Sequence, residues 1–520
     1  MHILLQLLSS IAATAVFYGL YTLLLATISR INSPFKDIPG PPNSHWFWGH
    51  MKDIIASDAG VLHEKWVEQY TKAINHILMN HFIYQKPEIA RYNLTQLLGA
   101  GVLVTEEDKH KLQRKIMNPA FGPAQIRELT EIFIEKSVEL RDAWMSEVSA
   151  AVDGVSKINV LNSLSEMTLD VIGLAGFNYK FNALNKTKGP SELKQAFSKI
   201  FGDPDAQRIR MWPFLQALIP SLRALPSQDA PGFKQAKATM GRIARELLRD
   251  SKASLQSTGE KDSNWSSRDL LSILVRSNMS GDPSQRMSDE DVLAQIPTFI
   301  VAGHETSSTA TTWALFALAE NADLQRKLRD ELLALPTENP SMDELNSLSY
   351  LDKVVRETLR VHCPVPGTIR VATKDDIIPL GKPFVDAKGI ERDHITIREG
   401  QTVYVPIINI NRDKTLWGED AFEFKPDRWD NLPEAVSTIP GVWSHLLTFL
   451  GGARACIGYR FSLMEIKALL FILVRTFEFK LAVPREEIIS KTTVVQRPRL
   501  KNDKEGGSQL PLLISVYQRP

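Results

Sequence analysis

The feature of this sequence that most constrains its fold is a cysteine in a glycine-rich loop near the C-terminus. Residues 449–458 read Phe-Leu-Gly-Gly-Ala-Arg-Ala-Cys-Ile-Gly, and Cys456 is one of only two cysteines in 520 residues. The residues from Phe461 to Phe477 then show a helical pattern. A cysteine at a helix start lies near backbone N–H groups and the positive end of the helix dipole, and both favour the thiolate. We therefore expect Cys456 to be a thiolate that binds a metal.

A single thiolate limits the kind of metal site that the chain can build. Four-cysteine zinc and iron–sulfur sites are excluded, whereas one axial ligand to a haem iron is compatible with the sequence. The alternative is an inert buried cysteine, which is the usual state of a lone cysteine. We interpret Cys363 as such a residue, because it lies in a His-Cys-Pro sequence without flanking glycines.

The loop also resembles a known signature. Phe449, Gly452, Arg454, Cys456 and Gly458 match the defining positions of the haem-binding loop of the cytochrome P-450 monooxygenases. The resemblance implies that the cysteine is the axial ligand to the iron of haem b and that the aromatic ring shields its sulfur. It also implies that the glycines let the loop approach the porphyrin and that the arginine pairs with a haem propionate.

Composition indicates one large globular domain. Hydrophobic residues make up 43% of the chain and charged residues 23%, and no repeat, low-complexity tract or linker follows residue 43. Length alone would suggest about three domains, but we predict a single domain over residues 44–520. The net charge of +1 argues against a nucleic-acid partner. Two widely separated cysteines give no disulfide framework, which fits a reducing compartment.

The N-terminus carries a long apolar segment. The stretch from Ile3 to Ile28 contains no charged residue and exceeds the roughly 20 residues that cross a bilayer. Arg30 and Lys36 follow it, so the positive-inside rule places the catalytic domain in the cytosol. We predict a transmembrane anchor over residues 1–30 and a proline-rich spacer over 31–43, with a cleaved signal peptide as the alternative. The arrangement resembles single-pass family members of the endoplasmic reticulum membrane.

A basic helix is predicted after the acidic residues Glu106 to Asp108. Its residues His110 and Arg114 are four positions apart and therefore share one face. The family has Trp-x-x-x-Arg here, so the resemblance implies that Arg114 contacts the haem propionates and that His110 takes the place of the tryptophan. The alternative is a solvated basic face, and this is our interpretation of the lysines at positions 109, 111 and 115.

A long helix is predicted from residue 288 to about residue 320. Ser288 and Asp291 have the spacing of a capping box, with Asp in place of the usual Glu or Gln. Pro297 predicts a kink in the residues before it. Gly303 is unfavourable within a helix by about 1 kcal/mol relative to alanine, which suggests a close approach or a distortion.

The middle of this helix resembles the Ala-Gly-x-Glu-Thr segment that crosses the haem on its oxygen-binding side in the family. The resemblance implies that Thr306 hydrogen-bonds dioxygen there and that Glu305 helps to relay protons. Breaking the O–O bond requires protons to be delivered into a mostly apolar cavity. A structural Glu-Thr pair is the alternative. A zinc-protease motif is excluded, because Ser308 stands where its second histidine would be.

A Glu-x-x-Arg pair at Glu357 and Arg360 lies on a predicted helix from Leu348 to Val361. The pattern is weak alone, but Arg428 follows in a Phe-Lys-Pro-Asp-Arg-Trp sequence, in the order that the family uses. The resemblance implies that these three residues form a buried, structural charge network near the cysteine loop. It also implies that Arg370, which starts a predicted strand, binds a propionate.

One family element is not found. Residues 62–85 have helical spacing and no turn signal, whereas the family has a two-stranded hairpin after its first helix. We predict that the hairpin is missing near residues 70–72, through splicing or the gene model. The strands predicted near Ile369 and Val403 would then lack pairing partners and expose edges.

Together these features predict a mainly α-helical protein with a small β-region, preceded by a transmembrane helix. The resemblance implies a haem-thiolate monooxygenase that inserts one atom of O2 into an apolar small molecule. Electrons would come from NADPH through a separate membrane-bound cytochrome reductase, since no flavin or nicotinamide domain is present. The basic helix is a candidate docking surface for this reductase. The Ala-Gly-His-Glu-Thr sequence resembles fungal enzymes of secondary metabolism, so a terpenoid substrate is expected. A haem-thiolate isomerase or dehydratase, and a haem-binding pseudoenzyme without turnover, are the alternatives.

Overall fold

The computed structural model describes residues 33–39, 71–185, 231–257, 269–278, 286–492, 494–503 and 506–518, together with single positions between 6 and 45 and between 192 and 223. Most of the predicted anchor over residues 1–30 therefore lies outside the described residues. Among the residues that are described, no helix is both long enough and apolar enough to cross a membrane.

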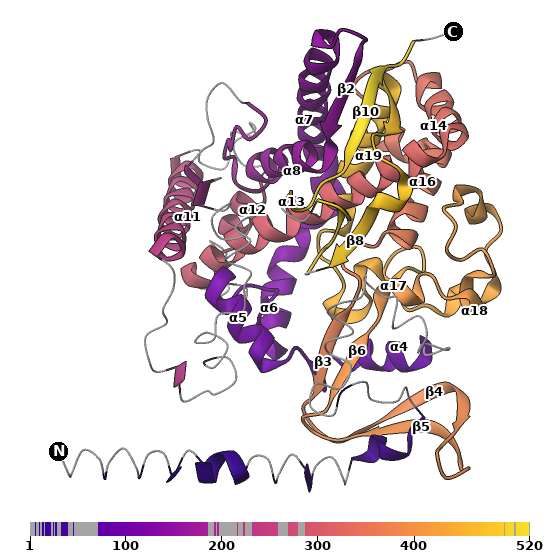
Figure 1. Ribbon diagram of the computed structural model, residues 1–520. Helices are drawn as coiled ribbons and strands as arrows, with labels where there is room; N and C mark the ends of the chain where they lie inside the picture. The colour runs from indigo at the N-terminus through magenta and orange to yellow at the C-terminus, as the bar shows by residue number, and fades with distance from the viewer. Residues whose placement is uncertain are drawn as a thin grey trace.

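The long helix α13 (Asp289–Glu320) lies at the centre of the helical part of the molecule (Figure 1). It begins where the sequence predicts, because the Ser288 hydroxyl accepts a hydrogen bond of 3.1 Å from the Asp291 N–H. Pro297 lies inside the helix and does not end it. The helix packs along α8 (Val160–Phe177) and α19 (Tyr459–Thr476), and its second half is buried almost all round.

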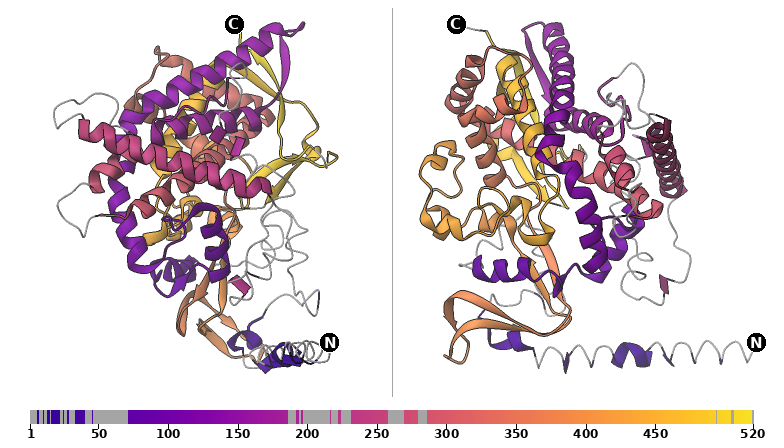
Figure 2. Two further views of the ribbon diagram at one scale, coloured as in Figure 1. Left: turned by 90° about the vertical axis from the view of Figure 1, so that its left-hand side faces the viewer. Right: turned by 180° about the vertical axis from the view of Figure 1, so that it is seen from behind.

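The other helices surround this centre. Figures 1 and 2 show α11 and α14 on opposite sides of the molecule. The described helices besides α8, α13 and α19 are α4 (Thr71–Met79), α5 (Glu88–Leu98), α6 (Glu107–Met117), α7 (Pro123–Ala150), α11 (Pro231–Ser257), α12 (Leu270–Asn278), α14 (Ala322–Ala334), α15 (Met342–Ser347), α16 (Ser349–Val361), α17 (Ile407–Ile410) and α18 (Lys414–Trp417).

The strands form small antiparallel sheets. One sheet has the order β1 (Tyr84–Gln85), β3 (Thr368–Ala372) and β6 (Thr402–Val405), with Tyr84 opposite Ala372 and Arg370 opposite Val403. A second sheet has the order β2 (Val155–Asn159), β10 (Pro511–Val516) and β7 (Phe477–Leu481). Two hairpins complete the described set: β4 (Asp376–Val385) with β5 (Glu391–Ile397), and β8 (Ile488–Thr492) with β9 (Gln496–Leu500). The fold is therefore mainly α-helical with small sheets, as predicted.

Two predictions about the N-terminal half of the domain are wrong. The helix predicted over residues 62–85 ends at Met79, and Tyr84 and Gln85 form strand β1. Its short backbone pairing with β3 is reinforced by the Thr373 N–H, which donates to the Ile83 carbonyl at 2.8 Å. The strands near Ile369 and Val403 do not lose all partners either, because β3 and β6 pair with each other.

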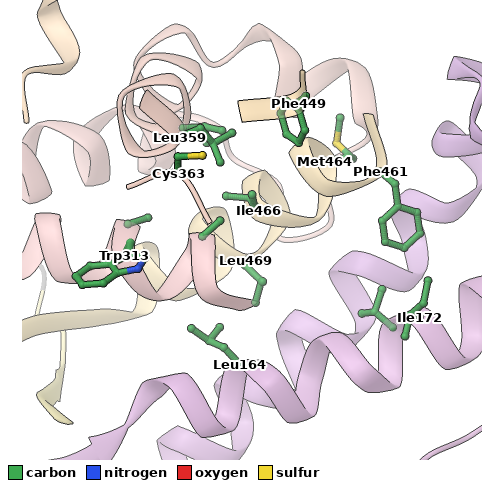
Figure 3. Packing of buried hydrophobic residues seen from close by; sticks show 14 of the residues in the cluster. Leu164, Ile172, Trp313, Leu359, Cys363, Phe449, Phe461, Met464, Ile466 and Leu469 are labelled. Atoms are coloured by element: carbon green, nitrogen blue, oxygen red, sulfur yellow. The ribbon is translucent and has the colours of Figure 1, made fainter. Parts of the chain in front are cut away.

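The contact between α8 and α13 explains the glycine in the centre of α13. A Cβ on Gly303 would lie 2.9 Å from the Cδ1 of Ile172, closer than real Cβ atoms approach a carbon. Figure 3 shows Ile172 and Leu164 pointing from α8 into the apolar core. Gly303 thus lets α8 pack closely against α13, since a larger residue there would make the Ile172 side chain shift.

Helix α19 lies inside the core and carries a buried acid. Met464, Ile466 and Leu469 point into the apolar cluster shown in Figure 3. Glu465 is fully buried among these residues, and burial raises the pKa of its carboxyl to about 8, although the neighbouring Ser307 hydroxyl opposes the shift. A carboxyl group with this pKa is mostly protonated at neutral pH.

We predict that Glu465→Gln makes the stability of the protein less dependent on pH. In the unfolded chain a glutamate titrates near pH 4.3, so the folded state binds more protons than the unfolded state between that pH and about 8. The stability that the protonated Glu465 contributes in the wild type is therefore fully present below pH 4.3. This contribution is lost as the pH rises to about 8. Gln keeps the shape of the side chain and cannot ionise.

The melting temperature of both proteins at pH 5.5 and pH 8.5 measures this effect. The wild type should lose more stability over this range than the variant, by at most about 3 kcal/mol. Glu486→Gln, at an exposed carboxylate, should follow the wild type. An equal loss in wild type and Glu465→Gln would contradict the prediction.

Candidate functional site

The loop that carries Cys456 is fixed by its own backbone. The Cys456 N–H donates to the Phe449 carbonyl at 2.8 Å, and the Gly458 N–H donates to the cysteine sulfur. The Phe449 ring is buried and contacts the rings of Trp443 and Tyr459. The sulfur therefore has a defined position at the start of α19.

The glycines of this loop are required by close contacts. Gly452 has a φ of +66°, and a Cβ there would lie 2.6 Å from the Leu78 carbonyl oxygen. A Cβ on Gly451 would lie 1.9 Å from the Pro440 carbonyl oxygen. Leu450 has a φ of 54° and a ψ of −169°, a region that only glycine adopts readily. The loop thus stores backbone strain beside the predicted metal ligand.

Opposing contributions determine the pKa of the Cys456 thiol. Its side chain is accessible to solvent, yet the surrounding protein raises the pKa of the thiol by desolvation. The Gly458 N–H and the Arg114 charge oppose this shift but do not overcome it. A backbone N–H group thus favours the thiolate, as predicted, but the desolvation of the sulfur outweighs its effect on the pKa. Cys363, in contrast, is fully buried, donates its S–H to the Val365 carbonyl, and has a pKa raised to about 12 by burial.

Helix α6 brings His110 and Arg114 to this loop in different states. Arg114 donates to the Ala455 carbonyl, next to the cysteine, and to the Asn118 side chain at 3.0 Å. Burial and the neighbouring cations Lys86 and Arg114 lower the pKa of His110 to about 4. His110 is therefore neutral at pH 7 and would act on an anion only as a hydrogen-bond donor.

Arg454 is already paired with an acid. Its guanidinium contacts the Glu106 carboxylate and donates to the Thr105 carbonyl at 2.8 Å, and both charged side chains are buried. Glu106 also accepts from the Lys86 N–H at 3.1 Å. Arg454 thus ties the cysteine loop to the start of α6, in addition to any contact with a propionate.

Around this pair the structure gathers more positive than negative charge. Lys86, Arg91, Arg370 and Arg454 influence one another, whereas Glu106 is the acid in contact with them among the described residues. Burial lowers the pKa of Arg370 and of Arg454 to about 10, and burial and three neighbouring arginines lower the pKa of Lys86. The Nε of Arg91 is buried without a hydrogen-bond partner. The cluster therefore favours a ligand with more than one negative charge.

Lys86 and Arg91 were not among the predicted site residues. Arg91 belongs to a Glu-x-x-Arg sequence, Glu88 to Arg91, that looks like a surface ion pair. Glu88 instead contacts Arg223 at 2.6 Å. No spacing in the sequence connects either cation with Arg454, because their proximity depends on how α5 and the loop before it pack.

The middle of α13 presents one accessible face. Ala302 and Thr306 are accessible, whereas the residues from Ser307 to Leu318 are buried. The Thr306 hydroxyl donates to the Ala302 carbonyl at 2.7 Å, one turn earlier. The Glu305 carboxylate forms an ion pair with Arg497 of β9, which the sequence did not predict. His304, which precedes Glu305 in the sequence, points into the core, and its Nδ1 lies 2.7 Å from the Ile300 carbonyl.

Glu357, Arg360 and Arg428 lie together in the core. The Glu357 carboxylate accepts from Arg360 at 2.8 and 2.9 Å and from Arg428 at 2.9 Å. It also accepts from the Lys425 N–H and the Trp429 indole. The Glu357 carboxylate and its two arginine partners are all hydrogen-bonded inside the protein, so the network is structural.

The lysines of α6 are exposed, but they are not equivalent. Lys109 forms an ion pair of 2.7 Å with Asp291 at the start of α13, whereas Lys111 and Lys115 are exposed and form no ion pair with a described residue. A separate cavity of about 690 Å³ lies between α7 and α8 and contains none of the predicted site residues. Its acids include Asp170, which accepts from the Ala183 and Leu184 N–H groups.

Comparison with known proteins agrees with this site. Residues 61–502 match the cytochrome P-450 family. The chain is 52% identical to cytochrome P-450 monooxygenase 205 of Postia placenta, over 98% of each chain. It is 48% identical to cytochrome P-450 monooxygenase 128 of the same fungus, over 98% of this chain and 97% of the other. It is 33% identical to cytochrome P-450 monooxygenase claW of Ampulloclitocybe clavipes, over 97% of each.

The alignment lengths add one detail. The alignment with the first relative spans 536 positions, but this chain has 520 residues, so at least 16 positions of that relative fall opposite gaps in this chain. Both the extent of these matches and the geometry around Cys456 lead to one identification. The chain belongs to the cytochrome P-450 family of oxidoreductases.

Proposed function

We propose that this protein is a haem-thiolate monooxygenase that inserts one oxygen atom from O2 into an apolar small molecule. The observation that carries the proposal is the combination at Cys456: a sulfur that is accessible yet desolvated, in a strained loop, beside an excess of buried cations. The net reaction consumes one O2, one NADPH and one proton, and it yields the hydroxylated product, NADP⁺ and water.

The residues present fit a haem. Cys456 would be the axial ligand, and a haem carries two propionates that match the excess of positive charge at Lys86, Arg91, Arg370 and Arg454. When bound, the haem supplies the activation of O2, and a thiolate ligand favours O–O cleavage. Binding of the metal also releases the thiol proton, because coordinating thiols are deprotonated.

The protein would supply protons from the accessible face of α13. Thr306 would hold a proton at its hydroxyl oxygen, which already makes a short hydrogen bond to its own helix. Glu305 would exchange protons with solvent at its carboxylate, which is 17% exposed. The accessible Glu305–Thr306 pair favours a monooxygenase over an isomerase or dehydratase, because those reactions need no protons for O–O cleavage. It also favours turnover over a pseudoenzyme.

Electrons would come from NADPH through a separate membrane-bound reductase. Lys111 and Lys115 are the lysines of α6 that fit a docking surface for an acidic partner. Lys109 fits less well, since Asp291 already neutralises it.

The anchor prediction leads to a location at the endoplasmic reticulum membrane, with the catalytic domain in the cytosol. It is supported by the uncharged sequence of residues 3–28 and by the exposure of its described apolar side chains. Phe17 is 78% exposed and Leu20 is 59% exposed, which a lipid environment would stabilise. The substrate class that we propose is a terpenoid of fungal secondary metabolism, on the resemblance of the Ala-Gly-His-Glu-Thr sequence; the named relatives are fungal monooxygenases.

We also propose that this chain lacks the two-stranded hairpin of the family near residues 70–72. Strand β3 pairs with β6 along most of its length, but on its other side the described residues supply only the two-residue strand β1. A relative with at least 16 additional positions has enough residues for a two-stranded hairpin. Ile369, which is 46% exposed on β3, fits an edge that a further strand would cover.

We predict that Cys456→Ala abolishes the absorption band that reduced, thiolate-ligated haem gives with carbon monoxide. The sulfur is the ligand, and alanine cannot replace it. Cys363→Ala is the matched control, and it should keep the band because this thiol is fully buried and bonded to the Val365 carbonyl. An unchanged band in the Cys456 variant would exclude a haem-thiolate enzyme.

We predict that Thr306→Ala releases more peroxide per NADPH consumed, while haem content stays the same. The variant loses the hydroxyl that holds a proton at the oxygen side of the site, so more reduced oxygen leaves as peroxide. Thr311→Ala on the same helix is the control, since this buried hydroxyl bonds to the Ser307 carbonyl. Equal peroxide yields in wild type and Thr306→Ala would reduce Thr306 to a structural residue.

We predict that restoring the missing segment stabilises the protein. The variant carries a two-stranded hairpin inserted between positions 70 and 71, taken from those residues of the 52% identical relative that fall opposite gaps in this chain. It should show a higher melting temperature and more haem per chain, because β3 gains a partner strand. A flexible Gly-Ser insert of equal length is the control. Identical haem content and melting temperature in the wild type, the hairpin variant and the Gly-Ser variant would show that the segment is dispensable. A transcript identical to this chain, whose protein product has full haem content and turnover, would show the same.

A further inference from the structure

The Glu305 carboxylate is held by a residue far away in the sequence. Arg497 of β9 donates from Nη2 to Oε1 of Glu305, and the two residues are separated by 192 positions. The side chains are 25% and 17% exposed, so the pair lies partly inside the protein at the edge of α13. No other cation contacts Glu305 among the ion pairs of the described residues.

Arg497 is well placed to hold this carboxylate because its backbone is fixed on both sides. The preceding residue, Gln496, donates its N–H to the Pro364 carbonyl at 2.8 Å. Its carbonyl accepts from the Trp313 indole at 2.9 Å, and Trp313 lies on α13 itself. The following residue is Pro498, whose ring restricts the backbone.

The same geometry fixes the position of the strand along the helix. Trp313 is eight residues after Glu305 on α13, or about 12 Å of helix rise. Strand β9 therefore contacts the helix through Gln496 at one point and reaches back through the long Arg497 side chain to Glu305. The hairpin that contains β9 acts on α13 at two places, and only one of them is beside Thr306.

We propose that Arg497 is a positioning residue for oxygen activation, which orients the Glu305 carboxylate so that it exchanges protons between solvent and the Thr306 side of α13. The proposal rests on the proposed monooxygenase function. A glutamate without a partner on a helix populates several rotamers. A glutamate that is hydrogen-bonded to an arginine guanidinium populates fewer. Loss of Arg497 leaves Glu305 in place but misdirected.

The test uses the full-length protein loaded with haem, its reductase and a panel of apolar terpenes, with products detected as a mass gain of one oxygen. Two oxidants are compared. With NADPH and O2 the site must deliver protons to oxygen, whereas hydrogen peroxide already carries its protons and yields product and water directly. A defect in proton delivery therefore affects the first reaction and leaves the second unchanged.

In Arg497→Ala, product per NADPH should fall on the order of tenfold and peroxide release should rise, since misplacing a catalytic group by about 1 Å costs up to a hundredfold. Peroxide-driven product and the carbon monoxide band should stay within twofold of wild type. Arg497→Lys should recover part of the coupling. Arg499→Ala, which removes a second cation of the same strand, is the matched control and should match wild type.

The double variant Glu305→Ala with Arg497→Ala tests whether Arg497 acts through Glu305 or independently of it. If Arg497 acts through Glu305, the double variant should be no worse than Glu305→Ala alone. Unchanged coupling in Arg497→Ala, an equal loss with both oxidants, or additive losses in the double variant would overturn the proposal. A wild type that forms no product with either oxidant would instead overturn the proposed function, and this role with it.

Discussion

The Glu357 carboxylate is the point on which the cysteine loop depends. A fully buried carboxylate is costly unless every lone pair finds a donor, and Arg360 and Arg428 supply most of them. The remaining N–H groups of Arg360 bond to backbone carbonyls, including that of Asn411 at 3.0 Å. The Asn411 side chain then accepts from the Leu447 N–H at 3.0 Å. A continuous chain of hydrogen bonds thus leads from α16 to the start of the loop that presents the sulfur.

Two features of that loop are unfavourable in the protein alone. Leu450 adopts a glycine-like conformation, and desolvation disfavours the charged thiolate of Cys456. Metal binding removes the second cost, because the cation replaces the thiol proton and balances the charge of the thiolate. The excess of positive charge around Arg454 is likewise unfavourable until an anionic group balances it. The site therefore gains stability when it is loaded, which couples haem binding to folding.

Local sequence patterns predicted the elements that are determined locally. The cap at Ser288, the end of α13 at Glu320 and the glycine loop around Cys456 each depend on neighbouring residues. Strand β1 was missed because two residues form no alternating pattern, and only pairing with β3 makes them a strand. Lys86 was missed as a site residue for a similar reason. Its role depends on burial beside Arg454, and sequence spacing carries no information about that contact.

The Glu305–Thr306 motif shows how far a motif alone can specify a site. Thr306 is held by the carbonyl of Ala302 on its own helix, so its geometry follows from the α13 sequence. Glu305 is held by Arg497, and therefore by the hairpin of β8 and β9 and its anchor at Trp313. A change in that hairpin would therefore move the Glu305 carboxylate without moving the Thr306 hydroxyl. Two adjacent residues of one motif thus depend on different parts of the fold, and intact spacing in the sequence ensures the position of only one of them.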